Sequence, residues 1–434
     1  MTETVEPSGT GRERPVDPDE ARARKLLVID TTYTMEAIRI RGIEDSVTCR
    51  DLDGFFSHVW SVHPVATLTT SEAWTPAVGK PVHHRLNARH TFVEGKIGRF
   101  SGFRRLFVPN FILAQLGLMW WLLRLIRRER IAVIRAGDPL YTGLVSWALA
   151  RLTGIPFVVR VGGNHDKFYE ETGQAMMPRL FRRRSVEKRV ERFVFRRADL
   201  VAGANQDNLN FALANGAVPE RATVFRYGNL IDRRHFVEPN QREGGAEACT
   251  RLGVEPGRFL LYIGRLEPVK RPQDVVRVLA ELNRRGHRLK ALFLGDGTMK
   301  SDMASLGDEL GVGADLVFAG SVDQGVLARL IPHCAAVVSP HTGRALSEAA
   351  LGGAPIAAYD IDWQGELIRR QVTGELVPYG DASGLAEATA RFVTDRDYAR
   401  RMGEAARSAA LEMLDPDMLD EHERSMYRKL LPNR

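Results

Sequence analysis

The sequence contains little cysteine, and its three cysteines lie too far apart to form a shared structural site. Cys49, Cys249 and Cys334 are scattered through 434 residues and are odd in number. Disulfide frameworks and zinc motifs both depend on several cysteines at short, regular spacings. The cysteine content therefore excludes a disulfide-stapled or zinc-ribbon protein and predicts a protein of the reducing cytoplasm.

The sequence also lacks a secretory signal and an uninterrupted hydrophobic run. Residues 1–24 are polar and rich in charge, proline and glycine, so we interpret them as a disordered tail. The longest apolar segment, Leu106–Ile126, has about the length of a membrane span, roughly 20 residues. It is interrupted by Pro109, Asn110, Gln115 and Arg124.

Three interpretations of this apolar segment remain open. It forms a helix packed on a protein core, a helix lying on a membrane surface, or a true membrane span. The second interpretation rests on basic residues that flank the segment, since these favour an anionic lipid surface. They are Arg104, Arg105, Arg127, Arg128 and Arg130. We therefore expect a cytoplasmic protein that is either soluble or peripheral at the inner face of the plasma membrane.

Charge of one sign is not in large excess, because 61 Lys and Arg oppose 54 Asp and Glu to give a net charge of +7. The densest basic run, Arg179–Arg197, has helical spacing. Its apolar side would comprise Phe181, Val186, Val190, Phe193 and Val194. A solvated helix face, an anionic membrane surface and a nucleic-acid contact all fit this run. No RNA- or DNA-binding motif accompanies it, so we expect no nucleic-acid partner.

Short apolar runs alternate with helical patterns along both halves of the chain, which predicts two doubly wound, parallel α/β sheets. The expected strands of the first half are Lys25–Asp30, Val65–Thr69, Ile131–Ala136, Pro156–Val161, Asp199–Ala204 and Ala222–Tyr227. Those of the second half are Phe259–Ile263, Leu289–Gly295, Asp315–Gly320, Ala335–Pro340, Ala354–Asp360 and Gly374–Pro378.

The chain is long enough for two domains, each with its own core. A polar, glycine-rich stretch at Arg233–Arg258 indicates the boundary between them. We place one domain at residues 25–238, the next at residues 239–415, and a final helix at residues 416–434. A cleft between two domains is a favoured ligand site.

Two cations follow the buried strand Phe259–Ile263, at the point where a helix is about to start. They are Arg265 and Lys270, within the stretch GRLEPVKRP. In open α/β sheets, ligands bind at the carboxyl ends of the strands. Two cations alone are equally consistent with a solvated surface loop.

A second segment, Ser339–Pro355, strengthens the prediction of a phosphate site. A strand ends there, a turn with Thr342 and Gly343 follows, and a helix is expected over Ala345–Leu351. Free N–H groups at a helix start favour phosphate oxygens, and arginine and lysine from a neighbouring strand end would hold the same group. Glu348, one turn into the helix, is suited to accept hydrogen bonds from a ribose diol.

Four motifs occur in order and together resemble one known family. GRLEPVK, GDG (Gly295–Gly297), VFAGSV (Val317–Val322) and SPHTGRALSEAALGGAPIAAYD resemble the nucleotide-sugar half of glycosyltransferase family 4. The match spans about Phe259–Val393. The first half resembles the family more loosely, through GNHD (Gly163–Asp166) and RADLVAGANQDN.

The resemblance implies a GT-B fold, with two Rossmann-like domains facing a cleft between them and a final helix crossing back to the first. It implies a retaining enzyme that moves a sugar from a nucleotide diphosphate donor to an acceptor hydroxyl. The expected donor is a UDP-sugar. The first domain would bind the acceptor and the second the nucleotide sugar. Cell-surface glycan or natural-product synthesis would both suit such an enzyme.

The resemblance also implies roles for particular residues. Arg265 and Lys270 would bind the diphosphate, and Glu348 would bind the ribose. His165 would contact the donor sugar near the reacting carbon. The expected catalytic set is therefore His165, Arg265 and Lys270. The expected donor-binding set is Gly264, Arg265, Lys270, Asp296, His341, Thr342, Gly343, Arg344, Ala345, Leu346 and Glu348. Without the resemblance, a histidine after two glycines fits a structural position in a loop as well as it fits a sugar-binding position.

The sequence departs from the family pattern at two places. The family has two glutamates with seven residues between them; the second aligns with Glu348 and the first falls at Pro340, where the neighbouring His341 is the candidate substitute. Thr31 and Thr32 stand where a glycine-rich loop usually follows the first strand.

The DID at Asp360–Asp362 matches a metal-binding pattern that also arises by chance, and we expect no essential metal or cofactor. A sugar-nucleotide 2-epimerase and a catalytically weak nucleotide-binding protein remain alternatives, and the acceptor and oligomeric state stay open.

Overall fold

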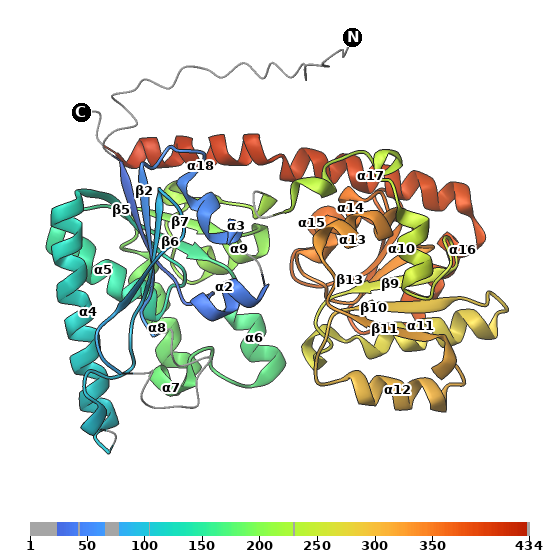
Figure 1. Ribbon diagram of the computed structural model, residues 1–434, viewed down its shortest axis with the longest axis horizontal. Helices are drawn as coiled ribbons and strands as arrows, with labels where there is room; N and C mark the ends of the chain where they lie inside the picture. Colours follow the sequence, from blue (N-terminus) through green and yellow to red (C-terminus); the bar gives the residue numbers. More distant parts are fainter. Residues whose placement is uncertain (1–23, 42–43, 66–77, 104, 229–230, 432–434) are drawn as a thin grey trace, which may run out of the picture. The chain divides into compact units, whose positions relative to one another are not determined.

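The computed structural model describes residues 24–41, 44–65, 78–103, 105–228 and 231–431 (Figure 1). Contacts divide the chain into two compact units. The first is drawn from Met1–Ala202, Ala212–Thr223 and Glu423–Arg434, and the second from Gly203–Phe211 and Val224–His422. The chain therefore changes unit more than once. The sequence-based boundaries after residues 24, 238 and 415 stay predictions.

Unit 1 contains a sheet in the order β3-β4-β2-β1-β5-β6-β7-β8. The strands are β1 Lys25–Ile29, β2 His58–His63, β3 Val82–Arg85, β4 His90–Glu94, β5 Ile131–Ala136, β6 Phe157–Val161, β7 Leu200–Gly203 and β8 Ala222–Val224. β1 pairs in parallel with β2 and β5, and β2 pairs in parallel with β4. β3 runs antiparallel to β4, so the prediction of a parallel sheet is wrong at this edge.

Three strands of unit 1 were not predicted from the sequence. β2, β3 and β4 carry five histidines among their residues, so they do not form the apolar runs typical of buried strands. The strand predicted at Val65–Thr69 lies almost wholly outside the described residues, and Val65 itself is in a turn. Of these three strands only β3 is at the edge of the sheet, so the weak pattern of β2 and β4 comes from the polar residues within them and not from an edge position.

The helices of unit 1 follow the predicted alternation with strands. They are α2 Met35–Arg41, α3 Asp45–Thr48, α4 Phe107–Glu129, α5 Tyr141–Thr153, α6 His165–Thr172, α7 Pro178–Phe181 and α8 Arg184–Phe195, and α9 Gln206–Ala214 is shared between the units. The apolar segment Leu106–Ile126 thus forms α4, and the basic run Arg179–Arg197 forms α7 and α8.

Unit 2 contains a sheet in the order β11-β10-β9-β12-β13-β14. The strands are β9 Phe259–Ile263, β10 Lys290–Leu294, β11 Leu316–Gly320, β12 Ala336–Ser339, β13 Ile356–Asp360 and β14 Glu375–Pro378, each lying inside a predicted strand. Every pair in this sheet is parallel. β9 is buried on both faces, with Leu261 in one core cluster and Leu260 in the other, which explains its continuous apolar sequence.

The helices of unit 2 cover both faces of this sheet (Figure 1). They are α10 Gly245–Arg251, α11 Gln273–Arg284, α12 Lys300–Glu309, α13 Gln324–Leu330, α14 Ala345–Leu351, α15 Gln364–Leu367, α16 Ala382–Thr394 and α17 Arg396–Leu414. The last helix, α18 Pro416–Leu430, starts in unit 2 and has its second half in unit 1, where Glu423 lies 3.0 Å from Arg135.

Each sheet reverses its strand order once. In unit 2 the chain moves from β9 outward through β10 to β11, and then returns to lay β12 on the other side of β9. In unit 1 it moves from β1 to β2 and returns to lay β5 on the other side of β1. Loops after the two central strands diverge at such a point and leave a crevice at their carboxyl ends, where ligands bind.

Candidate functional site

The crevice of unit 2 lies where β9 and β12 end, and it brings together two segments that are far apart in the sequence. Arg265 is exposed just after β9, and Lys270 is half-buried in the short 3-10 helix Pro268–Lys270. The Lys270 ammonium lies 3.9 Å from the position that a Cβ on Gly343 would occupy. Gly343 has φ +67 and belongs to the turn before α14. A cation from one strand end therefore faces the turn that follows the neighbouring strand.

Two glycines of the GDG motif hold the Arg265 segment in place by close backbone packing. A Cβ on Gly295 would lie 2.1 Å from the Gly264 carbonyl oxygen, and one on Gly297 would lie 2.3 Å from the Leu266 carbonyl oxygen. The backbone of Leu266 donates to the Asp296 carbonyl at 3.0 Å. The exposed Asp296 is thus fixed beside Arg265 by the backbone.

The loop between β12 and α14 is fixed by one buried amide, Gln364. Its Oε1 accepts from Ser339 Oγ at 2.6 Å, and its Nε2 donates to the Tyr359 carbonyl at 2.9 Å. Ser339 in turn hydrogen-bonds the hydroxyl of Thr342 at 2.6 Å. Gln364 was not among the predicted site residues, since its only sequence signal is a polar residue beside the DID segment.

His341 is the candidate substitute for the glutamate that the family pattern would put at position 340. Its Nδ1 lies 3.2 Å from the Val269 carbonyl oxygen, and its Nε2 lies 3.6 Å from an Asp362 carboxylate oxygen. His341 therefore bridges the Lys270 segment and the DID segment. Pro340 is buried and offers only its carbonyl to this loop, 3.4 Å from the Gln364 amide.

Helix α14 places its residues in two different environments. Arg344 is exposed at its start, Ala345 is half-buried, and Leu346 packs in the hydrophobic core. The side chain of Leu346 is therefore directed away from solvent, which limits its predicted donor contact to backbone atoms. Glu348 is 4% exposed, with an oxygen 3.6 Å from Arg344 Nε. Burial raises the pKa of Glu348, although Arg344 opposes the shift.

His165 lies in unit 1, at the first turn of α6 and just beyond the carboxyl end of β6. Asn164 caps this helix by accepting hydrogen bonds from the N–H groups of Asp166 and Lys167. His165 is buried, and its Nδ1 lies 2.7 Å from Glu191 Oε1. Because an ionised carboxylate only accepts, Nδ1 carries the proton. A substrate contact would then use Nε2, which accepts a hydrogen bond when the ring is neutral.

Glu191 belongs to a buried ionic cluster that the sequence analysis missed. Arg184 donates to both of its oxygens, at 2.7 and 2.8 Å, and also lies 3.3 Å from Glu187. Burial would raise the pKa of Glu191, but hydrogen bonds from His165 and Arg184 hold the pKa below its usual value. The expected apolar side of this helix is therefore partly wrong, because Arg184, Glu187 and Glu191 share the buried side with Val194.

Charged side chains lie at the carboxyl ends of β1 and β5 in unit 1, where the family pattern expects a glycine-rich loop after the first strand. Asp30 ends the β1 segment and accepts from the backbone and hydroxyl of Thr32, at 2.8 and 2.5 Å. Arg50 donates to the other oxygen of Asp30 at 2.6 Å. A Cβ on Gly137, just after β5, would lie 2.7 Å from Asp30 Oδ1. Thr32 thus orients Asp30 at the position where the family pattern expects glycines.

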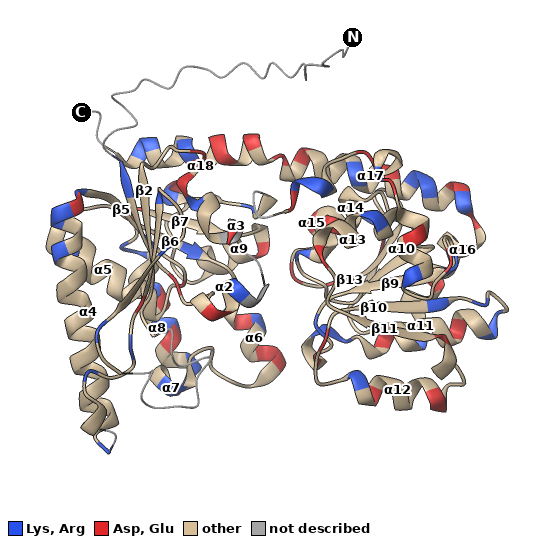
Figure 2. Ribbon diagram, in the orientation of Figure 1, with Lys and Arg blue, Asp and Glu red and all other residues tan. Residues whose placement is uncertain are grey.

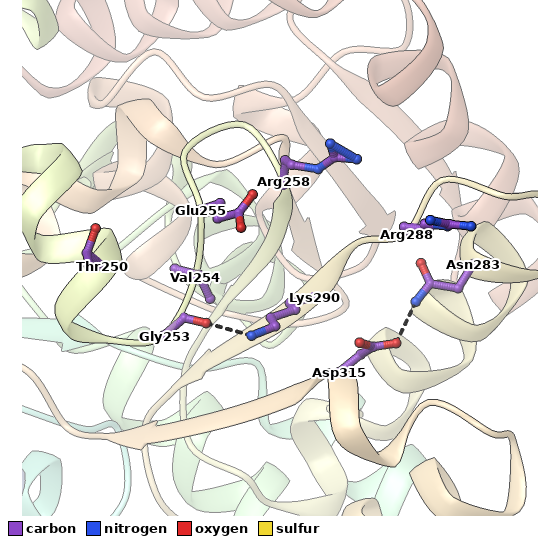
Figure 3. Close-up of a pocket in the computed structure, with 9 residues that line it drawn as sticks. All are labelled: Thr250, Gly253, Val254, Glu255, Arg258, Asn283, Arg288, Lys290 and Asp315. Carbon is purple, nitrogen blue, oxygen red and sulfur yellow. Dashed lines mark hydrogen bonds between the residues drawn. The ribbon is translucent and has the colours of Figure 1, made fainter.

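A surface cavity of about 720 Å³ lies at the opposite edge of the unit 2 sheet (Figure 3). Its lining comes from residues before β9, β10 and β11, from the first residue of β10 and from Asn283 on α11, and it contains none of the predicted donor-binding residues. Figure 3 shows the hydrogen bond that Lys290 donates to the Gly253 carbonyl and the one that Asn283 donates to the Asp315 carboxylate. This cavity is therefore separate from the crevice at the carboxyl ends of β9 and β12.

Comparison with solved structures gives the fold class. HepE from Anabaena, in complex with UDP and glucose, aligns with 94% of this chain and 100% of its own chain, with a TM-score of 0.65 and 17% sequence identity. The two doubly wound α/β units are those of a GT-B glycosyltransferase fold. The fold class predicted from the sequence is confirmed.

Comparison with family models and curated proteins gives the family. A "glycosyl transferase 4-like domain" model matches residues 63–228, and a "glycosyl transferases group 1" model matches residues 252–409. D-inositol 3-phosphate glycosyltransferase of Nocardia farcinica is 31% identical over 209 residues, and alpha-D-kanosaminyltransferase of Streptomyces kanamyceticus is 24% identical over 264 residues. These alignments span 46% and 67% of the relatives' own lengths, and 44% and 60% of this chain. The chain belongs to the glycosyltransferases of the family 4 type.

Proposed function

We propose that this protein transfers a sugar from a nucleotide diphosphate donor to an acceptor hydroxyl, with retention of the anomeric configuration. The observation that carries the proposal is the approach of Lys270 to the turn at Gly343, where the strand order of unit 2 reverses. A diphosphate at this crevice would be held by Lys270, by Arg265 and by backbone N–H groups of the turn.

The same cations would also contribute to catalysis. The donor loses its diphosphate in the reaction, and negative charge grows on the departing oxygen. Fixed positive groups stabilise this charge more in the transition state than in the ground state. In this proposal Arg265 and Lys270 supply that charge, and no metal ion is required.

Glu348 is placed to recognise the nucleoside. It lies on α14, one turn beyond Gly343, and an ionised carboxylate accepts hydrogen bonds from a ribose diol. Burial disfavours the ionised form, so bound hydroxyl groups would stabilise a charge that the empty protein holds unfavourably. We propose uridine as the nucleoside, because the solved neighbour HepE is in complex with UDP.

His165 would contact the donor sugar through Nε2. Its Nδ1 is engaged by Glu191, so the ring orientation is fixed before any substrate binds. With a neutral ring, Nε2 would accept a hydrogen bond from a sugar hydroxyl. A lipid-linked glycan, a polysaccharide and a small natural product all remain compatible acceptors.

A calorimetric titration with UDP, GDP, ADP and TDP tests the proposal. We expect one nucleotide to bind, and Arg265→Ala or Lys270→Ala to weaken binding by about 1.5–3 kcal/mol, as for a charge-assisted hydrogen bond. Arg284→Ala is the matched control, because Arg284 is an exposed cation on α11 that pairs with Glu281. Absence of binding by all four nucleotides, or equal loss in the control, would contradict the proposed site.

Incubation of the protein with the nucleotide sugar alone separates transfer from the alternatives. An epimerase converts the donor sugar without an acceptor, whereas a transferase needs an acceptor hydroxyl. A protein that binds nucleotide but neither epimerises nor transfers the sugar would be the catalytically weak nucleotide-binding protein of the second alternative. That alternative rests on Pro340, which presents no polar side chain to the donor sugar.

A further inference from the structure

We propose that the outer face of α4 docks on an anionic lipid surface. Four large apolar residues follow each other at intervals of four along this helix and are strongly exposed: Val108 63%, Ile112 50%, Leu116 61% and Trp120 56%. Residues four apart share one face of a helix. The exposed stripe is continued by Leu106 and Leu113, which are 55% and 44% exposed. An apolar stripe of this length in water indicates a surface that is covered in use.

The opposite face of the same helix faces the protein. Asn110, Ala114, Leu118 and Leu122, also four apart, are buried. Asn110 accepts hydrogen bonds from the backbones of Arg99 and Phe100 at 2.7 and 2.9 Å. Gln115 accepts from the Tyr141 hydroxyl at 2.5 Å. The inner face is therefore tied to unit 1 by polar contacts.

These contacts argue against a membrane span. The helix is long and apolar enough to cross a bilayer by length and composition alone, yet a third of its most apolar window is buried in the protein. A crossing would expose the inner amides to hydrocarbon and break their hydrogen bonds, which costs several kcal/mol per group. A helix that keeps its inner face on unit 1 and lays its outer face on the lipid avoids that cost.

The charges around the stripe select an anionic lipid. Residues 95–130 contain eight Lys and Arg and one acidic residue, Glu129, which pairs with Arg128 and Lys25. Figure 2 shows α4 without charge along its middle and basic at its carboxyl end. Arg124 continues the exposed stripe after Trp120 and stacks 3.3 Å from the centre of its ring. An amphipathic tryptophan between an apolar stripe and arginines suits the boundary between acyl chains and phosphate headgroups.

A second element supports the same orientation. Met176 and Leu180, at and just before α7, are 43% and 46% exposed. Arg179, Arg182 and Arg183 are exposed beside them. In Figure 1, α7 and the first turns of α4 both lie toward the lower end of unit 1. In this proposal, the apolar and basic groups of α7 would meet the same lipid surface as the start of α4.

A second copy of the chain fits the stripe less well than lipid does. The stripe is followed by Arg124, Arg127 and Arg128 at one end and preceded by Arg105 at the other. Pairing two such stripes in either direction would bring arginines of the two copies together. Like charges repel at this range, whereas anionic headgroups would neutralise the arginines at both ends.

Flotation of the full chain with vesicles tests the proposal. Vesicles of phosphatidylglycerol mixed with phosphatidylcholine are compared with phosphatidylcholine alone, at low and at high salt. We expect binding to the anionic vesicles, weakened by salt, and little binding to the neutral ones. The double variant Ile112→Glu/Leu116→Glu should weaken binding roughly tenfold or more.

Two further variants separate the stripe from general effects. Leu310→Glu/Val372→Glu removes two exposed apolar residues of unit 2, 43% and 52% exposed, and should bind like the original chain. Arg105→Gln/Arg127→Gln should weaken binding only at low salt. Circular dichroism checks that each variant folds.

The proposal is overturned by absence of binding to anionic vesicles at low salt, or by equal binding of the stripe variant and the unit 2 control. It is also overturned if light scattering finds a dimer that the stripe variant dissociates, with no vesicle binding. The assay needs neither donor nor acceptor, so its result is independent of the proposed transfer reaction.

Discussion

His165 Nδ1 lies 2.7 Å from Glu191 Oε1, and both side chains are buried within unit 1. Arg184 holds the same carboxylate through two hydrogen bonds. The histidine ring therefore has a fixed orientation and a fixed proton on Nδ1.

Replacing Glu191 with Gln should destabilise the protein and change how its stability depends on pH. The mutant loses the charged partner of Arg184, at an expected cost of about 1–3 kcal/mol in unfolding free energy at neutral pH. Despite burial, the folded-state pKa of Glu191 lies below the ordinary value for glutamate, about 4.5, because His165 and Arg184 donate hydrogen bonds to the carboxylate. Its contribution to stability is therefore present above about pH 4.5 and is lost as pH falls through the folded pKa.

Urea unfolding of both proteins over the acidic pH range measures this effect. The original chain should lose more stability than Glu191→Gln as the pH falls below about 4.5. Glu171→Gln is the control, because Glu171 is an exposed carboxylate of unit 1. Parallel pH profiles for the original chain and Glu191→Gln would contradict the prediction.

Replacing His165 with Ala should lower kcat and leave nucleotide binding unchanged. The loss of one positioning contact to the donor sugar is expected to reduce kcat roughly tenfold to a hundredfold. The Kd for the nucleotide should stay the same, since the proposed nucleotide contacts all come from unit 2. Glu191→Gln should show a smaller loss in kcat, because the ring stays but its orientation is less strictly fixed. A His165→Ala variant with full kcat would assign this histidine to the structure alone.

Replacing Glu348 with Gln should separate binding from stability. Because burial raises the folded-state pKa of this carboxyl above the ordinary value for glutamate, the original chain loses stability as pH rises through the folded pKa. The amide has no charge to bury, so Glu348→Gln should be at least as stable at neutral pH. Its affinity for the nucleotide should nevertheless fall by about 1.5–3 kcal/mol, because the amide has no charge and has only one acceptor oxygen for the two ribose hydroxyl groups. Thermal unfolding and calorimetry measure the two effects, and loss of both together would indicate a structural role.

Replacing Gly295 with Ala should disrupt the segment that carries Arg265. Gly295 has φ +140, and an added Cβ would lie 2.1 Å from the Gly264 carbonyl oxygen. Gly286→Ala is the matched control, since Gly286 also has a positive φ, +91, but nothing lies within 4 Å of its added Cβ. Backbone strain of about 1–2 kcal/mol applies to both variants. The clash applies only to Gly295→Ala, which should be the less stable variant and bind nucleotide more weakly; equal behaviour would contradict this account.

Much of unit 2 was predictable from the sequence because its central strands are buried on both faces. Such strands appear as continuous apolar runs ended by glycine, as in Phe259–Ile263 followed by Gly264. The strands β2, β3 and β4 of unit 1 lack that signal, and β2, with a histidine at each end, was missed although it lies between β4 and β1. The buried positions of α8 were also missed, because Glu187 and Glu191 appear as solvated charges until Arg184 is placed beside them.

The sequence by itself determined the alternation of strands and helices, the two cations after β9, and the glycine turn before α14, since each depends on neighbours within a few residues. Only the tertiary structure decided that β12 lies beside β9, that Lys270 faces Gly343, and that Gln364 holds the loop after Ser339. It also decided which face of α4 packs on unit 1 and which face is left exposed. These relationships join residues distant in the chain, so they depend on strand order and packing, which local periodicity does not encode.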